Sequence, residues 1–178
     1  LWDPGRHRMP WLDSLAQLNR PFVLADFGQA AADCDVVGFV AVEAGVGADD
    51  AFTEVAWLAS CAVQEPRLLG IVAAASIERG AAVREELTAL RAFGPLVRGV
   101  RRNLQAEPDP TFCLKPDFVA GVRLLPEFGL TFDLCIAHTQ LPPVTALVHA
   151  CPETQFILDH LGKPDVRRAE PESWRADI

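Results

Sequence analysis

Short apolar runs return along this chain at intervals of about 30 residues, the length of one strand, one crossover helix and two loops. The first two runs are almost continuously apolar, which is typical of strands buried on both faces of a parallel sheet. This spacing predicts a βα array of five units. The predicted strands are Val36–Val42, Leu68–Ala75, Val97–Val100, Leu130–Ile136 and Gln155–Asp159.

The segments between these runs carry apolar residues at helical spacing. In the first segment, one helical face is expected to hold Phe52, Val55, Ala56, Ala59 and Val63. Gly129 is placed as a C-cap, while Pro126 favours an early end to the helix before it. Residues 15–32 are expected to be helical in parts, and residues 168–178 show no clear helix or strand pattern. The predicted helices are Asp50–Gln64, Ala81–Phe93, Pro116–Phe128 and Pro143–Cys151.

Two architectures fit five βα units. An open doubly wound sheet that binds a dinucleotide usually has a motif of three glycines after its first strand. Here Gly45 and Gly47 supply the first two glycines of this motif, and the third is absent. A (β/α)8 barrel needs eight strands and about 250 residues. The chain has 178 residues, so a barrel requires strands that lie outside it. The pattern alone leaves both architectures open.

Charge and composition restrict the class of partner. The chain has 16 basic and 24 acidic residues, a formal net charge of −8, which argues against nucleic acid as a partner. Half of its residues are hydrophobic, unlike a disordered chain. We find no apolar run of about 18 residues and no secretory leader pattern, so we expect a cytoplasmic protein with no membrane partner. The five cysteines form no Cys-x-x-Cys pair and are expected to be reduced and mostly buried.

Catalytic groups in βα folds sit at the carboxyl ends of the strands. His160 is expected to end the last predicted strand, where it could act as a general acid or base or as a metal ligand. The alternative is a hydrogen-bonded core histidine. Arg101 follows the third strand and could hold a carboxylate or polarise an ester carbonyl, with an ordinary ion pair as the alternative. His138 follows the fourth strand by two residues and could join the same site, although we expect a solvated loop histidine rather than a site residue from its position alone.

Other polar residues have structural interpretations. Glu43 and Glu54 could each be a base or a metal ligand, but we expect ordinary ion-paired carboxylates. Asp133, within a strand, should have a partner. His7 and His149 are expected in a loop and on a helix surface. The long loop over residues 103–117 is either a substrate lid or a surface excursion.

Three motifs together resemble a known family. They are Trp2-Asp3-Pro4-Gly5 with Pro10-Trp11-Leu12, then Gly99-Val100-Arg101-Arg102, and the segment from Leu158 to Pro164 that reads LDHLGKP. They are similar to the amidohydrolase-related (amidohydrolase 2) hydrolases, and most similar to the branch of L-fuconolactonase-like and dicarboxylate lactonases. The resemblance covers the whole chain.

The resemblance implies an α/β fold, a partial (β/α)8 TIM-barrel that holds about strands two to six, so that residues 1–178 form one incomplete domain. The family's first strand ends in a His-x-His pair expected just before Leu1, and its last strand carries an aspartate with no equivalent here. His160 matches the histidine that closes the sixth strand, as a catalytic residue and metal ligand. Arg101 matches a substrate-binding arginine, and His138 and Lys163 are predicted to bind substrate as well.

The implied reaction is the attack of water on a lactone of a sugar acid or dicarboxylate. The implied cofactor is one divalent ion such as zinc, although some lactonases of this branch need no metal. The predicted partner is a small-molecule lactone, and the chain by itself is expected to be inactive. The alternative is a non-catalytic βα domain that binds a small anion or completes itself by self-association.

Overall fold

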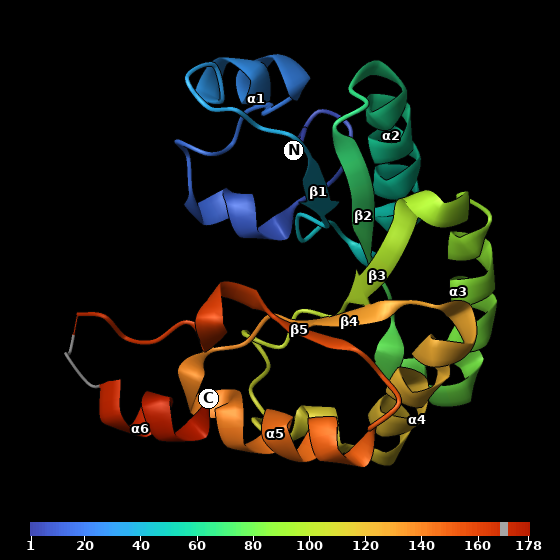
Figure 1. Ribbon diagram of the computed structural model, residues 1–178, viewed down its shortest axis with the longest axis vertical. Helices are drawn as coiled ribbons and strands as arrows, with labels where there is room; N and C mark the ends of the chain where they lie inside the picture. Colours follow the sequence, from blue (N-terminus) through green and yellow to red (C-terminus); the bar gives the residue numbers. More distant parts are fainter. Residues whose placement is uncertain (168–170) are drawn as a thin grey trace. The chain divides into compact units, whose positions relative to one another are not determined.

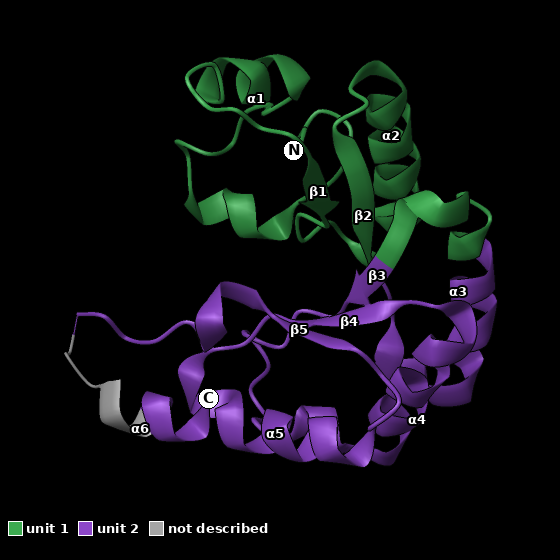
Figure 2. Ribbon diagram, in the orientation of Figure 1, with its two compact units in different colours: residues 1–74, 90–98 green, residues 75–89, 99–178 purple. Residues whose placement is uncertain are grey.

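The computed structural model describes residues 1–167 and 171–178, which divide into two compact units. Unit 1 comprises residues 1–74 and 90–98, and unit 2 comprises residues 75–89 and 99–178 (Figure 2). Strand β3 (Val97–Arg101) and helix α3 (Val83–Arg91) each contribute residues to both units. Among the described residues, no helix is long and apolar enough to cross a membrane.

Unit 1 contains the first complete βα unit. Strands β1 (Phe39–Val42) and β2 (Leu68–Ala74) are parallel, and helix α2 (Ala51–Gln64) connects them (Figure 1). The short helix α1 (Leu24–Ala30) precedes them. The Trp11 indole N–H donates a hydrogen bond to the carbonyl of Ala44 at 2.6 Å, which ties the N-terminal segment to the loop after β1.

Unit 2 contains the rest of β3, with β4 (Thr131–Leu134) and β5 (Phe156–Leu158). Its helices after β3 are α4 (Pro116–Leu124), α5 (Leu141–Ala150) and α6 (Pro171–Asp177) (Figure 1). These strands are parallel, and each pairs with its successor along the chain. An open doubly wound sheet reverses its strand order at a switch point, whereas a barrel does not. The sequential order therefore favours the barrel.

One face of the unit 2 strands packs against helices. Phe132 on β4 lies edge-on to Phe118 of α4 and to Phe156 of β5, with ring centroids 5.9 and 6.1 Å apart. Side chains alternate along a strand, so Asp133 points to the opposite face from Phe132. The same holds for Arg101, because the register pairs Val100 with Phe132 and Arg101 with Asp133.

The predicted elements are confirmed in kind and order, with corrected bounds. Helix α4 stops at Leu124 because Pro126 cannot continue it, and Gly129 caps the following turn with a φ of 62°. Strand β1 begins only at Phe39, and α5 begins two residues earlier than predicted. Helix α6 was missed, since its polar sequence carries no apolar stripe.

The predicted face of α2 was wrong. Val63 is 85% exposed and Phe52 is 37% exposed, whereas Glu54, Leu58 and Cys61 are buried with Val55. The helix is apolar on several sides, so periodicity did not single out the buried one.

His7 was expected in a loop and lies in one, but its side chain is buried. The cysteines are free, and all except Cys34 are buried, as predicted.

Gly121 marks the closest packing of α4 in unit 2. A Cβ atom at this position would lie 2.2 Å from the carbonyl oxygen of Ile77, a backbone atom that cannot rotate away. We expect Gly121→Ala to lower the free energy of unfolding by about 1–3 kcal/mol through overpacking. Gly28→Ala in α1 is the matched control, because nothing lies within 4 Å of its Cβ position. It should raise the stability by about 0.5–1 kcal/mol. Urea denaturation that shows equal effects would contradict this packing.

Candidate functional site

Arg101, Asp133 and Asp159 converge in unit 2, near the carboxyl ends of β3, β4 and β5. The Arg101 guanidinium donates from Nη1 to Oδ2 of Asp159 at 2.9 Å, and the two side chains are only 13% and 12% exposed. Asp133 is the direct register partner of Arg101 on the neighbouring strand. These strands therefore bring one cation and two carboxylates together.

Asp133 is the most deeply buried of the three. It is 3% exposed, and its Oδ1 atom has no hydrogen-bond partner among the described residues. Burial, followed by the negative charge of Asp159, raises the pKa of Asp133 to about 6, against the opposing effect of Arg101. A partner for Asp133 was predicted from sequence, and Arg101 is the neighbouring cation. Strongly perturbed acids cluster at functional sites, so Asp133 joins the candidate site.

His160 follows β5, but not as the end of the strand. Strand β5 stops at Leu158, and His160 lies in a turn with a φ of 52°. This left-handed conformation breaks the alternation that predicted a common face for Phe156, Leu158 and His160. The His160 side chain is exposed. Its role as a catalytic residue or metal ligand stays a prediction.

Lys163 and His138 meet in the same part of unit 2. The Lys163 ammonium contacts Oε1 of Gln105, from the loop after β3, and lies 3.4 Å from Sγ of Cys135, just after β4. His138 Nδ1 lies 3.2 Å from the carbonyl oxygen of Lys163. None of the ion pairs found among the described residues includes Lys163, so its charge meets only neutral groups there.

The long loop after β3 is anchored at its start. Arg102 pairs with Glu78 at 2.9 Å and with Glu107 at 2.5 Å, and the Leu104 amide donates to the carbonyl of Cys135. The role of this loop as a substrate lid stays a prediction.

Sequence reasoning did not single out Asp159 or Gln105. Asp159 could have been found as an acid at a strand end, but Gln105 gave no signal.

The other acids considered from sequence lie in unit 1. Glu54 is 1% exposed, and its Oε1 accepts a hydrogen bond from the Ala44 amide. Glu43 is also buried and accepts a hydrogen bond from the Gly45 amide at 2.6 Å. His149 is exposed on α5, as expected. Within residues 1–167 and 171–178, no three His, Cys, Asp or Glu side chains are placed to hold a metal ion.

Comparisons with known proteins bear on the family and the fold. The Amidohydrolase family model matches residues 1–178. The chain is 27% identical to an amidohydrolase of Burkholderia multivorans solved with bound zinc, with a TM-score of 0.82 over 99% of this chain and 60% of that one. Amidohydrolase 2 from Bifidobacterium longum subsp. infantis is 25% identical, with a TM-score of 0.74 over 99% of this chain and 64% of that one.

Two further matches cover a similar share of their own chains. A probable 2-pyrone-4,6-dicarboxylic acid hydrolase of Acinetobacter baumannii, solved with citric acid bound, shares the fold at 15% identity, with a TM-score of 0.74 over all of this chain and 63% of that one. The uncharacterized protein y4mH of Sinorhizobium fredii is 24% identical over 98% of this chain and 64% of its own length. This chain thus spans less than two thirds of these relatives.

The strand order and the structural likeness confirm the partial (β/α)8 barrel over the open sheet. The family match extends over every residue of the chain, including the three motifs on which the resemblance was based. This chain therefore belongs to the amidohydrolase family.

Proposed function

We propose that this chain is part of a hydrolase that opens a lactone, the cyclic ester of a sugar acid or dicarboxylate. The observation that supports this most is the cluster of Arg101, Asp133 and Asp159 near the carboxyl ends of three successive strands. In (β/α)8 barrels, this end of the strands carries the active site. Family membership makes hydrolysis the expected class of reaction.

In the proposed reaction, water attacks the ester carbonyl carbon of the ring. The bond between this carbon and the ring oxygen breaks, the ring oxygen takes up a proton, and an open hydroxy acid leaves. His160 is proposed as a general acid or base, since an imidazole is the side chain most often used for proton transfer at neutral pH. Lys163 is proposed to attract the carbonyl oxygen or a carboxylate of the substrate. Arg101 is bound to Asp159, so in the proposed contact the substrate would share the Arg101 guanidinium with Asp159.

The family resemblance also implies a divalent metal ion, and the Burkholderia relative was solved with zinc. The described residues do not fit such a group by themselves, because no three potential ligands lie close together. We therefore assign no step of the reaction to a metal. The proposal that His160 is one ligand of a zinc site in the complete protein can be tested by elemental analysis of that protein and its His160→Asn variant.

The proposed function is tested by offering neutral aldonolactones and carboxylated lactones to the complete protein and to residues 1–178 alone. We expect the complete protein to open at least one class, and His160→Asn to lower its kcat about 100-fold or more, as for loss of a general acid or base. The matched control is His149→Asn, which changes an exposed histidine on α5. Failure of the complete protein to open any lactone would contradict the proposal, and turnover by residues 1–178 alone would refute the expected inactivity of the chain.

A second candidate is a non-catalytic domain that binds a small anion. One observation favours it: the Lys163 ammonium contacts only neutral groups among the described residues, and so retains its charge for a ligand. The same assay separates the two candidates. Binding of an aldonate without turnover of its lactone would support the second.

A further inference from the structure

We propose that His138 is a positioning residue that holds a strained left-handed turn, His160–Lys163, and through this turn fixes the direction of the His160 side chain. The position of His138 just after β4 suggested a residue that binds substrate. The structure instead points His138 at the protein's own backbone. The kinetic part of the argument rests on the proposed function, whereas the conformational part does not.

All four residues of this turn have positive φ angles. The values are 52° for His160, 54° for Leu161, 67° for Gly162 and 51° for Lys163. For residues with a Cβ atom, this conformation is unfavourable and occurs as single residues rather than in runs. Lys163 also precedes Pro164, and a residue before proline prefers an extended conformation. Only Gly162 adopts its angle without strain.

Burial of the turn's own side chains does not explain the strain. Leu161 is 62% exposed, and the His160 side chain is exposed as well. Only Gly162 is tightly packed, where an added Cβ would lie 3.2 Å from the side chain of Leu141. Strained backbone persists only when surrounding contacts determine it. The Lys163 side chain supplies some of these contacts, to Gln105 and Cys135, and the backbone of the turn supplies the others.

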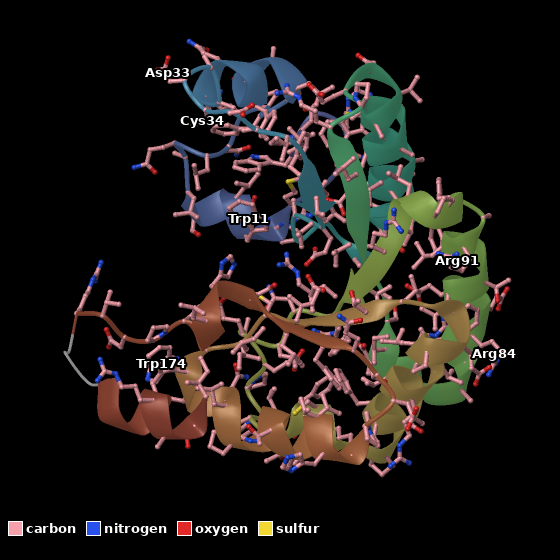
Figure 3. The ribbon with its side chains drawn as sticks, viewed as in Figure 1. Trp11, Asp33, Cys34, Arg84, Arg91 and Trp174 are labelled. Atoms are coloured by element: carbon pink, nitrogen blue, oxygen red, sulfur yellow. The ribbon has the colours of Figure 1, made fainter. Side chains whose placement is uncertain are left out.

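Three hydrogen bonds supply the backbone contacts. Within the turn, the Lys163 amide donates to the carbonyl of His160 at 3.0 Å. From outside, the indole N–H of Trp174 on α6 donates to the carbonyl of Leu161 at 2.7 Å (Figure 3). His138 completes the set at the carbonyl of Lys163, the last residue of the turn. A carbonyl oxygen can only accept, so Nδ1 of His138 must carry the proton.

The position of His138 is itself fixed by its neighbours. His138 begins the short helical turn His138–Gln140, which leads into α5. The buried side chain of Gln140 accepts a hydrogen bond from the Ala137 amide and donates one to the Leu104 carbonyl at 2.8 Å. The ring of His138 thus reaches the turn from an anchored segment.

The consequence falls on His160, because the backbone angles of a residue set the direction in which its side chain leaves the chain. If the turn relaxed to an extended conformation, the His160 ring would leave the chain in another direction. A displacement of about 1 Å at a catalytic group can lower turnover about 100-fold. A residue that only holds the turn should therefore affect kcat and leave substrate binding almost unchanged.

The test uses the complete protein with His138→Ala and His138→Asn, where the asparagine amide offers an N–H in place of Nδ1–H. We expect His138→Ala to lower kcat for the lactone about 10- to 100-fold with KM within about threefold of wild type. His138→Asn should recover most of the loss. His149→Ala, the same change at an exposed position on α5, is the control and should alter neither constant.

A second variant tests the strain directly. Leu161→Gly removes the Cβ that makes the left-handed angle unfavourable, so the turn needs less support. Adding it to His138→Ala should restore at least part of the lost kcat, although the added glycine makes no contact with His138. A raised KM in His138→Ala with unchanged kcat would show that His138 binds substrate, and would overturn the proposal. Failure of Leu161→Gly to rescue would overturn it as well.

Hydrogen exchange at the Lys163 amide gives a readout that does not depend on turnover. This amide should exchange about tenfold faster or more in His138→Ala, and near the wild-type rate in His138→Asn and in the double variant with Leu161→Gly. A complete protein that opens no lactone contradicts the proposed function only. In that case, an unchanged exchange rate in His138→Ala would refute the positioning role, and a faster rate that His138→Asn reverses would support it.

Discussion

Replacing Arg101 with methionine is expected to lower the free energy of unfolding by about 3–5 kcal/mol. The methionine side chain has a similar length, so the main loss is the positive charge. Asp159 then loses its partner at 2.9 Å while it remains 12% exposed, and Asp133 loses its neighbouring cation. Two carboxylates close together without a cation cannot both stay ionised at low cost.

Denaturant unfolding of the complete protein at pH 8 measures this effect. The matched control is Arg84→Met, which breaks the ion pair between Arg84 and Glu127, whose side chains are 50% and 55% exposed. That exposed pair should contribute less than about 1 kcal/mol. Adding Asp159→Asn to Arg101→Met should restore part of the lost stability, because it removes the unpaired charge. Equal losses for Arg101→Met and Arg84→Met would show that the first pair is not effectively buried.

Replacing Asp133 with asparagine is expected to stabilise the protein above about pH 7, by about 3 kcal/mol relative to its effect below pH 4. Asparagine has nearly the shape of aspartate and no charge. The buried carboxyl has its pKa raised from 3.8 to about 6, so the folded protein binds a proton that the unfolded chain releases. An ionised Asp133 therefore opposes folding, and asparagine removes this penalty.

The direction of the pH dependence follows from the same shift. The stability that a protonated Asp133 contributes is fully present below pH 3.8, and it is lost as the pH rises through about 6. Other carboxyls act in the opposite sense. Arg67, for example, lowers the pKa of Glu65 to about 2. The stability of wild type as a function of pH is therefore the sum of effects from several carboxyl groups. The difference between Asp133→Asn and wild type isolates the one group.

Urea titrations of both proteins from pH 3.5 to 8 provide the measurement. The stability difference should change mainly between about pH 4 and 7. Glu127→Gln, at an exposed position, is the control and should show a difference of less than about 1 kcal/mol over this range. A constant difference between Asp133→Asn and wild type would mean that Asp133 titrates normally when folded. A gain in stability with loss of turnover would be the pattern of a group kept for function at the expense of stability.

Much of the secondary structure could be predicted because periodicity is local. Apolar runs and the helical spacing between them identified, in order, every strand that the structure describes and the main helices. Pro126 indicated the early end of α4, whereas Gly129 caps the turn that follows this helix. The errors arose where the local pattern was weak. Helix α6 is largely polar, so periodicity did not reveal it. Helix α2 is apolar on several sides, so periodicity did not show which side is buried.

The candidate site could be predicted only as a set of positions. Arg101 and His160 were found because each lies at the carboxyl end of a predicted strand. Their partners could not be found in this way. Asp159 and Asp133 lie 58 and 32 positions after Arg101, and only the register of parallel strands makes them its neighbours. The left-handed angles of the turn were also hidden, because three of its four residues are not glycine.

The sequence by itself determined the βα order and the family, because hydrophobic spacing and short motifs are properties of neighbouring residues. Only the tertiary structure decided that Asp133 is a buried carboxyl with a raised pKa, and that His138 binds a backbone carbonyl rather than facing free solvent. The physical reason is that burial, charge pairing and backbone strain depend on residues brought together across distant parts of the chain, and no local pattern encodes these contacts.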